Sequence, residues 1–266
     1  MTLESFEKID AENQLVVIGE KLEETSIKDL SSFSFDPSML IPKFESCSDL
    51  KKDSSDDDGL YTLWSNDQQK FIPTLCKFDT TGSYAVMQSR VKDNEMLEFI
   101  FMTEKGFQDG FGSSSNEFWL GLERISEITR AKRTLKIILS NEQTIKEYRY
   151  EGFKVTSKND GYRLDYDFFS NVDESDLLSL SKERPFYTYS AWKQTEQSFG
   201  CMTSGAWWFH CEVSKSSDGF ASKHIQSNLN GVFSDETKLD RIFDNRWESW
   251  PYNRGSFTRT QMLISN

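Results

Sequence analysis

Four cysteines constrain this chain more than any other feature, because Cys47 and Cys76 form one close pair and Cys201 and Cys211 another, more than a hundred residues further on. The spacing leaves two interpretations open. The four side chains are either buried thiols of a cytosolic protein, or two local disulfides, Cys47–Cys76 and Cys201–Cys211, of a secreted one. Four cysteines allow three pairings, so spacing alone does not choose among them.

Charge and hydropathy exclude several classes of function. The 266 residues include 31 basic and 43 acidic ones, and the resulting net charge of −12 disfavours nucleic-acid binding. No apolar run approaches the roughly 20 residues that span a bilayer. The first 30 residues show no basic start followed by an apolar core. We therefore expect no transmembrane segment, and either an intracellular chain or a processed or truncated form of a secreted one.

The sequence gives little support for a catalytic site or a metal site. The two histidines, His210 and His224, are 14 positions apart, and no HExxH, CxxC or GxSxG motif occurs. Zinc sites and serine nucleophiles typically carry such motifs. The acidic run DSSDDDG at 53–59 also fails as a calcium loop, because serines stand at its first position and in place of the bidentate glutamate. We expect no metal site and no enzyme.

Hydrophobic periodicity predicts an α+β fold with a largely antiparallel sheet. Asn116 is expected to cap a helix over 117–128, because Phe118, Leu122 and Ile125 follow the spacing i, i+4, i+7.

Strand signals surround this helix. A strand with a bulge at Gly152 is expected near 148–155, and alternation over 162–168 predicts a half-buried strand. Other short strands are expected at 60–64, 71–78 and 84–88, and residues 135–139 form a short apolar run.

Residues 1–43 are expected to form an acidic N-terminal extension, and residues 44–266 a single domain. Apolar residues recur loosely among the glutamates and lysines of the first 30 positions, which indicates an amphipathic helix or a coiled-coil stub. Prolines and serines in 31–45 indicate a linker.

Five short segments occur in a specific order. EFWLGLE at 117–123 is preceded by GFG at 110–112, and GAWW at 205–208 and SNLNG at 227–231 follow. Trp247, Trp250 and the MLI run at 262–264 close the series. Together with the four cysteines, these segments resemble the fibrinogen C-terminal domain, the globular module of fibrinogen chains, ficolins, tenascins, angiopoietins and fibrinogen-related lectins. The resemblance covers about residues 44–265.

The resemblance implies the fibrinogen C-terminal globular fold: an α+β domain with a central, mainly antiparallel sheet, few short helices and a loop-rich C-terminal binding subregion. It also implies two disulfides, Cys47–Cys76 and Cys201–Cys211, and a cis peptide bond between His210 and Cys211. Members of this family are not enzymes. They are extracellular proteins that bind acetylated sugars, peptide termini or receptors beside the second disulfide.

This chain departs from the family in the loop that holds calcium. Residues 192–201, WKQTEQSFGC, are about two residues shorter than usual, contain no aspartate and place Lys193 where an acid is usual. Calcium takes six to eight oxygen ligands with negative charge among them, and Glu196 alone is a weak set. We therefore expect no calcium and no other cofactor.

The resemblance also suggests which residues line the binding pocket. One wall would consist of Phe209, His210, Cys211 and Glu212, another of Thr203 and Ser204, and a third side of Phe243 and Asp244. Trp207, Trp208, Trp247 and Trp250 are expected to be core rings that support it.

A polar insertion follows the last cysteine. Residues 212–226, EVSKSSDGFASKHIQ, replace a connection of two or three residues in relatives. Two interpretations stay open: a tolerated surface loop, or an element that reshapes the pocket and its specificity.

Two functions follow from the resemblance. The first is a secreted, lectin-like recognition module that binds a glycan or acetylated ligand, as in innate immunity. The second is a module that engages a protein partner, such as a cell-surface receptor, a gamete or a matrix component. An N-terminal coiled coil would allow a homo-oligomer in either case.

Overall fold

The computed structural model describes residues 43–52, 57–92, 99, 102–113, 117–171, 176–192, 194, 205–210, 212–215, 221–224, 228–231 and 257–265. Residues 1–42, including the expected coiled-coil stub, lie outside this set, so the predicted extension and its boundary stay predictions.

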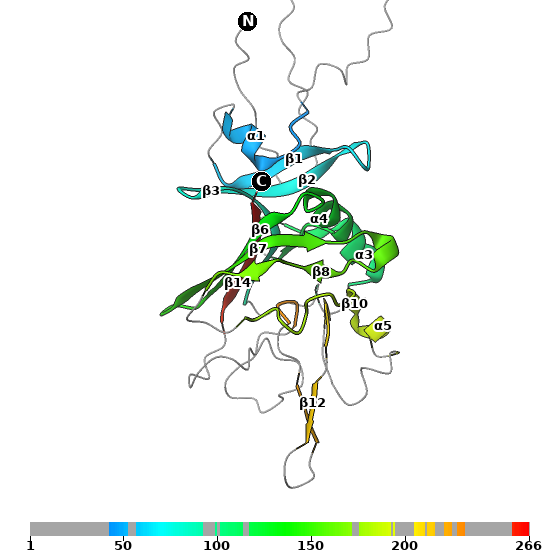
Figure 1. The fold of residues 1–266 in the computed structure, drawn as a ribbon. Helices are drawn as coiled ribbons and strands as arrows, with labels where there is room; N and C mark the ends of the chain where they lie inside the picture. Colours follow the sequence, from blue (N-terminus) through cyan, green and yellow to red (C-terminus); the bar gives the residue numbers. More distant parts are fainter. Residues whose placement is uncertain are drawn as a thin grey trace, which may run out of the picture.

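One antiparallel sheet forms the centre of the domain (Figure 1). Its main path follows the spatial order β1 (Gly59–Ser65), β2 (Lys70–Asp79), β3 (Gly82–Val91), β14 (Arg259–Ser265), β6 (Arg133–Ser140), β7 (Ile145–Val155) and β8 (Leu164–Asp165). Three short strands pair at its sides: β4 (Phe111–Gly112), β5 (Phe118–Trp119) and β9 (Phe168–Phe169). The strands predicted at 60–64, 71–78 and 84–88 are confirmed as β1, β2 and β3, and the apolar run at 135–139 lies in β6.

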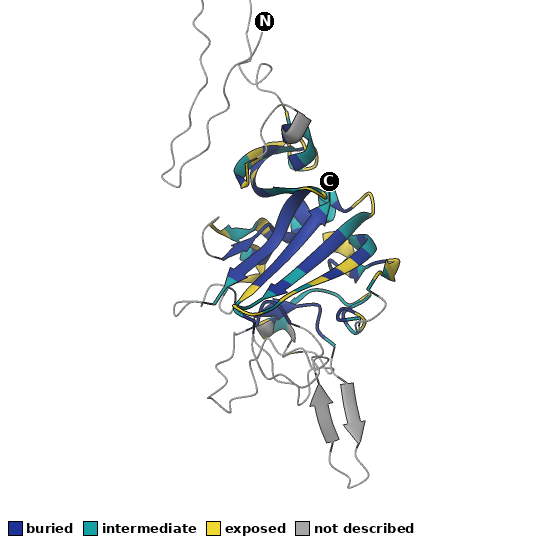
Figure 2. Ribbon diagram, turned by 90° about the vertical axis from the view of Figure 1, so that its left-hand side faces the viewer, coloured by how far each residue is buried: buried dark blue, intermediate teal, exposed yellow. Residues whose placement is uncertain are grey.

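The last strand lies in the middle of this sheet, because β14 pairs with β3 on one side and with β6 on the other. The middle strands are mostly buried, and β3 is buried from residue 83 to residue 90 (Figure 2). The C-terminal strand therefore joins the two halves of the sheet, β1–β3 and β6–β8.

Short helices accompany the sheet: α1 (Cys47–Lys52), α3 (Glu104–Asp109), α4 (Leu122–Ile128), α5 (Tyr189–Trp192) and the 3-10 turn η3 (Lys158–Asp160). Thr103 caps α3, since its Oγ1 accepts a hydrogen bond from the Gly106 amide. No helix of the described residues is long and apolar enough to cross a bilayer.

The predicted Cys47–Cys76 disulfide is present and joins α1 to β2, with both cysteines fully buried and their Cα atoms 5.6 Å apart. Cys201 and Cys211 lie outside the described residues, so the second disulfide and the cis bond at His210–Cys211 stay predictions.

The predicted helix over 117–128 is wrong in its first turn. Phe118 and Trp119 form β5, which pairs with β3 and β4, and α4 begins at Leu122. Gly121 has a φ of +96°, which a right-handed helix does not contain. A Cβ on Gly121 would also lie 2.7 Å from the carbonyl carbon of Asp109, so the glycine allows α3 and α4 to meet closely.

The bulge predicted at Gly152 is confirmed. Leu135 pairs with Tyr150 and Arg133 with Phe153, so β7 carries one extra residue at this point, and Gly152 has a φ of +69°.

The strand predicted over 162–168 is broken opposite that bulge. Within this segment β8 and β9 pair with β7, whereas residues 166–167 form no ladder pair, although the Asp167 amide still donates to the carbonyl of Glu151 at 2.8 Å. Phe168, expected on the buried side, is 59% exposed. The cause is local: the Asp167 side chain lies against the Gly152 backbone, and the alternation of faces is lost there.

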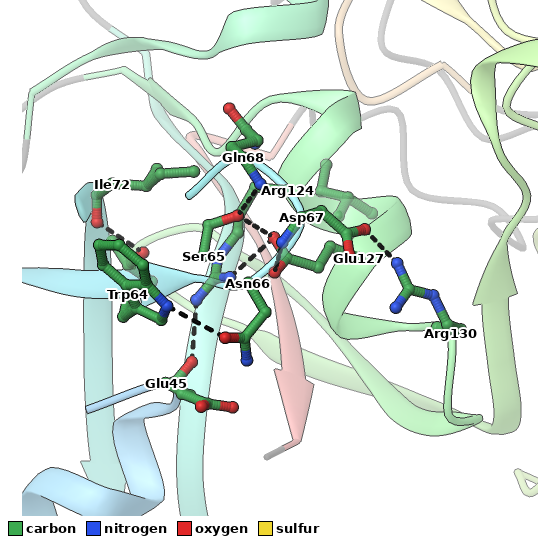
Figure 3. Close-up of polar contacts among 12 residues, drawn as sticks. Glu45, Trp64, Ser65, Asn66, Asp67, Gln68, Ile72, Arg124, Glu127 and Arg130 are labelled. Atoms are coloured by element: carbon green, nitrogen blue, oxygen red, sulfur yellow. Dashed lines mark hydrogen bonds and ion pairs between the residues drawn. The ribbon is translucent and has the colours of Figure 1, made fainter. Parts of the chain in front are cut away.

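A buried ion pair fixes the N-terminal part of the domain to α4 (Figure 3). Arg124 Nη1 donates to Glu127 Oε2 at 2.9 Å, and Arg124 Nη2 donates to the carbonyl of Glu45 at 2.8 Å. Glu127 Oε2 also accepts a hydrogen bond from Ser65 Oγ at 2.6 Å. Burial alone would raise the pKa of Glu127, but the hydrogen bonds from Ser65 and Arg124 outweigh it and lower that pKa.

Candidate functional site

The segment at residues 205–210 carries the described part of the predicted pocket wall. Its first residues form β11 (Ala206–Trp207), which pairs with β10 (Tyr187–Thr188). Residues 205–209 are buried, and His210 is partly exposed. Phe209 is only 1% exposed, so its ring supports the wall from within, whereas His210 is the residue of this segment that reaches solvent.

Trp207 and Trp208 are core rings, as predicted, because neither has exposed surface. Trp207 Nε1 donates to Ser181 Oγ at 3.2 Å, and Trp208 Nε1 donates to the carbonyl of Tyr162 at 2.6 Å. Tyr162 has a φ of +50°, an uncommon value for a bulky residue, and this carbonyl contact holds it in place. The backbone that carries His210 is thus fixed by two buried indole hydrogen bonds.

A cluster of aromatic rings connects this segment to the central sheet. The Trp208 ring lies 5.2 Å from Trp207 and 5.0 Å from Phe186 between centroids, and Phe186 lies 5.8 Å from Trp119 of β5. Trp119 then meets Phe107 of α3 at 5.7 Å. Such pairs add to the free energy of area burial and fix the relative orientation of the rings. The site therefore rests on a rigid support.

The loop at residues 228–231 lies against the same segment. Asn230 Nδ2 donates to the carbonyl of Ala206 at 2.9 Å, and Gly205 leaves no space for a side chain beside the carbonyl of Asn230. The sequence identified this loop as a family motif, SNLNG, but did not assign it to the site. The SNLNG motif was the sequence signal that could have assigned this loop to the site. In the structure its two asparagines are buried and hydrogen-bonded.

The insertion after Cys211 contains a β-hairpin of two strands, β12 (Glu212–Lys215) and β13 (Ala221–His224). Glu212 pairs with His224 and Lys215 with Ala221. Among the described strands, β12 and β13 pair only with each other, and Figure 1 shows them projecting away from the main sheet. The register brings His224 to the end of the hairpin where His210 enters it, although the two histidines are 14 positions apart.

The other predicted site residues are not placed. Thr203, Ser204, Cys211, Phe243 and Asp244 lie outside the described residues, and Glu212 is described only by its backbone in β12. The proposed wall at 203–204 and the side at 243–244 therefore stay predictions. Most of the loop at 192–201 and the tryptophans Trp247 and Trp250 also lie outside the described residues. In the described part of the chain, no three His, Cys, Asp or Glu side chains gather as a metal site would require.

The antiparallel sheet, together with the buried segment 205–209 and the loop at 228–231, defines a fibrinogen-like globular domain. The family model described as "Fibrinogen beta and gamma chains, C-terminal globular domain" matches residues 43–266. The chain therefore belongs to this family, as its sequence motifs predict.

Three relatives show the range of sequence similarity. Human microfibril-associated glycoprotein 4 is 27% identical over 227 residues, covering 82% of this chain and 83% of that protein. Human ficolin-3 is 26% identical, covering 73% of this chain and 61% of that protein. Rat angiopoietin-2 is 26% identical, covering 88% of this chain and 46% of that protein. The chain thus spans less than two thirds of the length of the latter two.

Solved structures confirm the predicted fold. The fibrinogen-like globe domain of human ANGPTL6 has a TM-score of 0.65 at 24% identity and covers 85% of this chain and 96% of that chain. Lamprey fibrin D-dimer, complexed with the peptide ligand Gly-His-Arg-Pro-amide, has a TM-score of 0.65 at 20% identity and covers 90% of this chain and 80% of that chain.

Proposed function

We propose that this chain is a non-catalytic extracellular recognition module that binds a glycan or another acetylated ligand at residues 205–210 and their neighbours. The observation that carries the proposal is the partly exposed His210 at the end of a buried, aromatic-supported segment. A site of this kind presents a polar group on a preformed backbone, which keeps the ordering cost of binding low.

Extracellular location is part of the proposal. The Cys47–Cys76 disulfide supports it, because structural disulfides persist in oxidising compartments. Family membership and the similarity to ficolin-3 favour the lectin-like function over an enzyme.

Calcium-independent recognition is a further part of the proposal. The loop at 192–201 offers Glu196 as its single carboxylate and carries Lys193, which is a poor donor set for a hard cation. Isothermal calorimetry with calcium alone tests this point. No heat of tight binding is expected, whereas tight binding abolished by E196A would contradict it.

A protein partner is the second candidate function, and the hairpin β12–β13 favours it. Among the described strands these two pair only with each other, and an extended segment of a partner would add to the hairpin as a further strand. A receptor or matrix protein would supply such a segment, and a homo-oligomer formed through residues 1–43 would multiply weak contacts.

A glycan array probed with the whole protein, with calcium and with a chelator, tests the proposal. Binding to N-acetylated sugars under both conditions, lost in H210A, is the expected result. F168A is a matched control, since Phe168 is exposed on β9, a strand of the main sheet, and its removal should leave binding unchanged. Silence across the array would contradict the lectin function and favour the protein partner.

A further inference from the structure

A buried arginine at the end of β3 contacts the loop beneath the candidate site. Arg90 has no exposed surface, and its Nη1 donates to the carbonyl oxygens of Leu229, at 2.9 Å, and Gly231, at 2.5 Å. Its Nε donates to Glu117 Oε1 at 2.9 Å. The guanidinium therefore bonds to a carboxylate beside β5 on one side and to two loop carbonyls on the other.

Stability alone does not account for a charge pair at this place. Both side chains are almost fully buried, and Arg90 lies over the Phe99 ring at 4.6 Å. Burial lowers the pKa of Arg90, and the charge of Glu117 and its hydrogen bond partly oppose this. An arginine guanidinium nevertheless stays protonated in proteins. Apolar side chains of similar volume often stabilise such a position as well or better. Apolar side chains, however, supply no hydrogen-bond donors for the carbonyls of Leu229 and Gly231.

The loop at residues 228–231 connects Arg90 to the candidate site. Gln88, two residues before Arg90 on β3, also donates to the carbonyl of Leu229, at 3.0 Å. The next loop residue, Asn230, donates to the carbonyl of Ala206 at the start of β11. From Ala206 the chain runs directly to His210. Buried hydrogen bonds thus link β3 to Ala206, and four residues of backbone link Ala206 to His210.

We propose that Arg90 and Glu117 are positioning residues for the recognition site, acting through the loop at residues 228–231. The planar fork of arginine reaches the carboxylate and two carbonyls at once, which the point charge of lysine does not do. The proposal rests on the proposed function only in taking residues 205–210 as the site.

A second buried ion pair provides a matched control. Arg124 and Glu127 are also 2.9 Å apart and nearly as buried, but they join α4 to the N-terminal part of the domain through the carbonyl of Glu45. Loss of Arg124 should therefore loosen the N-terminal part and leave the site unchanged.

Hydrogen exchange of the whole chain, measured by mass spectrometry, tests the proposal without any ligand. In R90K, amides at 205–210 and 228–231 should exchange at least about tenfold faster than in the wild type, with β6 and β7 unchanged. In R124M, acceleration should be confined to 43–67. Unchanged exchange at 205–210 in R90K, or equal acceleration over the whole sheet, would overturn the proposal.

The double variant R90M/E117L separates positioning from simple stability. An apolar pair should restore the melting temperature towards that of the wild type, but exchange at 205–210 and 228–231 should stay fast. If exchange returns to the wild-type rate, the pair has only a structural role and the proposal is wrong. If R90M/E117L does not fold, R90K alone decides.

Binding to immobilised N-acetylglucosamine provides a second measurement. If the wild type binds, R90K should lose at least about tenfold in affinity and R124M less than twofold. If the wild type does not bind, the proposed lectin function fails while the exchange data still decide the positioning role.

Discussion

The side-chain amide of Asn230 donates a hydrogen bond to the carbonyl of Ala206 across 2.9 Å, although the two residues are 24 positions apart. Asn230 has no exposed surface, so nothing replaces this bond when it is lost. We predict that N230A lowers the free energy of unfolding by about 1 to 3 kcal/mol, and that N230D, which replaces the donor by a carboxylate oxygen and adds a buried charge, lowers it at least as much. Urea denaturation measures this. A loss below about 0.5 kcal/mol in both variants would contradict the central position of this bond.

The hairpin β12–β13 should be dispensable for the fold. Its strands pair with no other described strand, so replacing residues 214–222 by an Asn-Gly turn should change the free energy of unfolding by less than about 1 kcal/mol. The binding result then separates the two functions. Retained binding to N-acetylated sugars with lost binding to a protein partner assigns the hairpin to the partner, whereas loss of sugar binding assigns it to the pocket.

Gly121 should tolerate no side chain. Its φ is +96°, and a Cβ would lie 2.7 Å from the Asp109 carbonyl carbon. G121A should therefore destabilise the domain by about 1 to 3 kcal/mol or more in thermal unfolding. Gly82 is a matched control, because a Cβ there meets only Tyr84 at an ordinary 3.4 Å. G82A should unfold within about 1 kcal/mol of the wild type, and equal effects of the two variants would contradict the account of the α3–α4 contact.

Glu127 should make stability depend on pH. Its pKa in the folded protein lies below the ordinary value of 4.5. The carboxylate therefore stabilises the fold above about pH 4.5, and this contribution is lost as the pH falls through the lower, folded-state pKa. We predict that E127Q is less stable than the wild type at pH 7 and that the difference shrinks towards pH 3.

Chemical denaturation at several pH values checks the prediction for Glu127. The exposed Glu142 gives a control, E142Q, which should unfold like the wild type at pH 7. A difference between E127Q and the wild type that stays constant down to pH 3 would show that Glu127 does not act through its charge.

Local signals predicted the strands well. Short β-like runs between turn signals located β1, β2 and β3, and Gly152 located the bulge, because both features depend on neighbours along the chain. The helix at 117–128 was predicted with a wrong start, since Phe118 has helical spacing to Leu122 but lies on a strand held by long-range pairs. Pairing with β3 and the backbone of Gly121 outweighed that periodicity.

The long-range contacts of the site could not be predicted from the sequence. Arg90 and Glu117 are 27 positions apart, and nothing in their local sequence indicates that they meet. The family motifs located residues 205–208 and 227–231 but did not show that the second segment holds the first. The register of β12 and β13 brings His224 opposite Glu212. Nothing in the local sequence of either strand indicates this pairing.

The proposed function predicts an extracellular domain in which a second disulfide, Cys201–Cys211, holds the recognition segment. Peptide mapping of the unreduced protein by mass spectrometry tests this most directly. The predicted result is two cross-linked pairs, Cys47–Cys76, which the structure contains, and Cys201–Cys211. Free thiols at Cys201 and Cys211 in the purified native protein would contradict it.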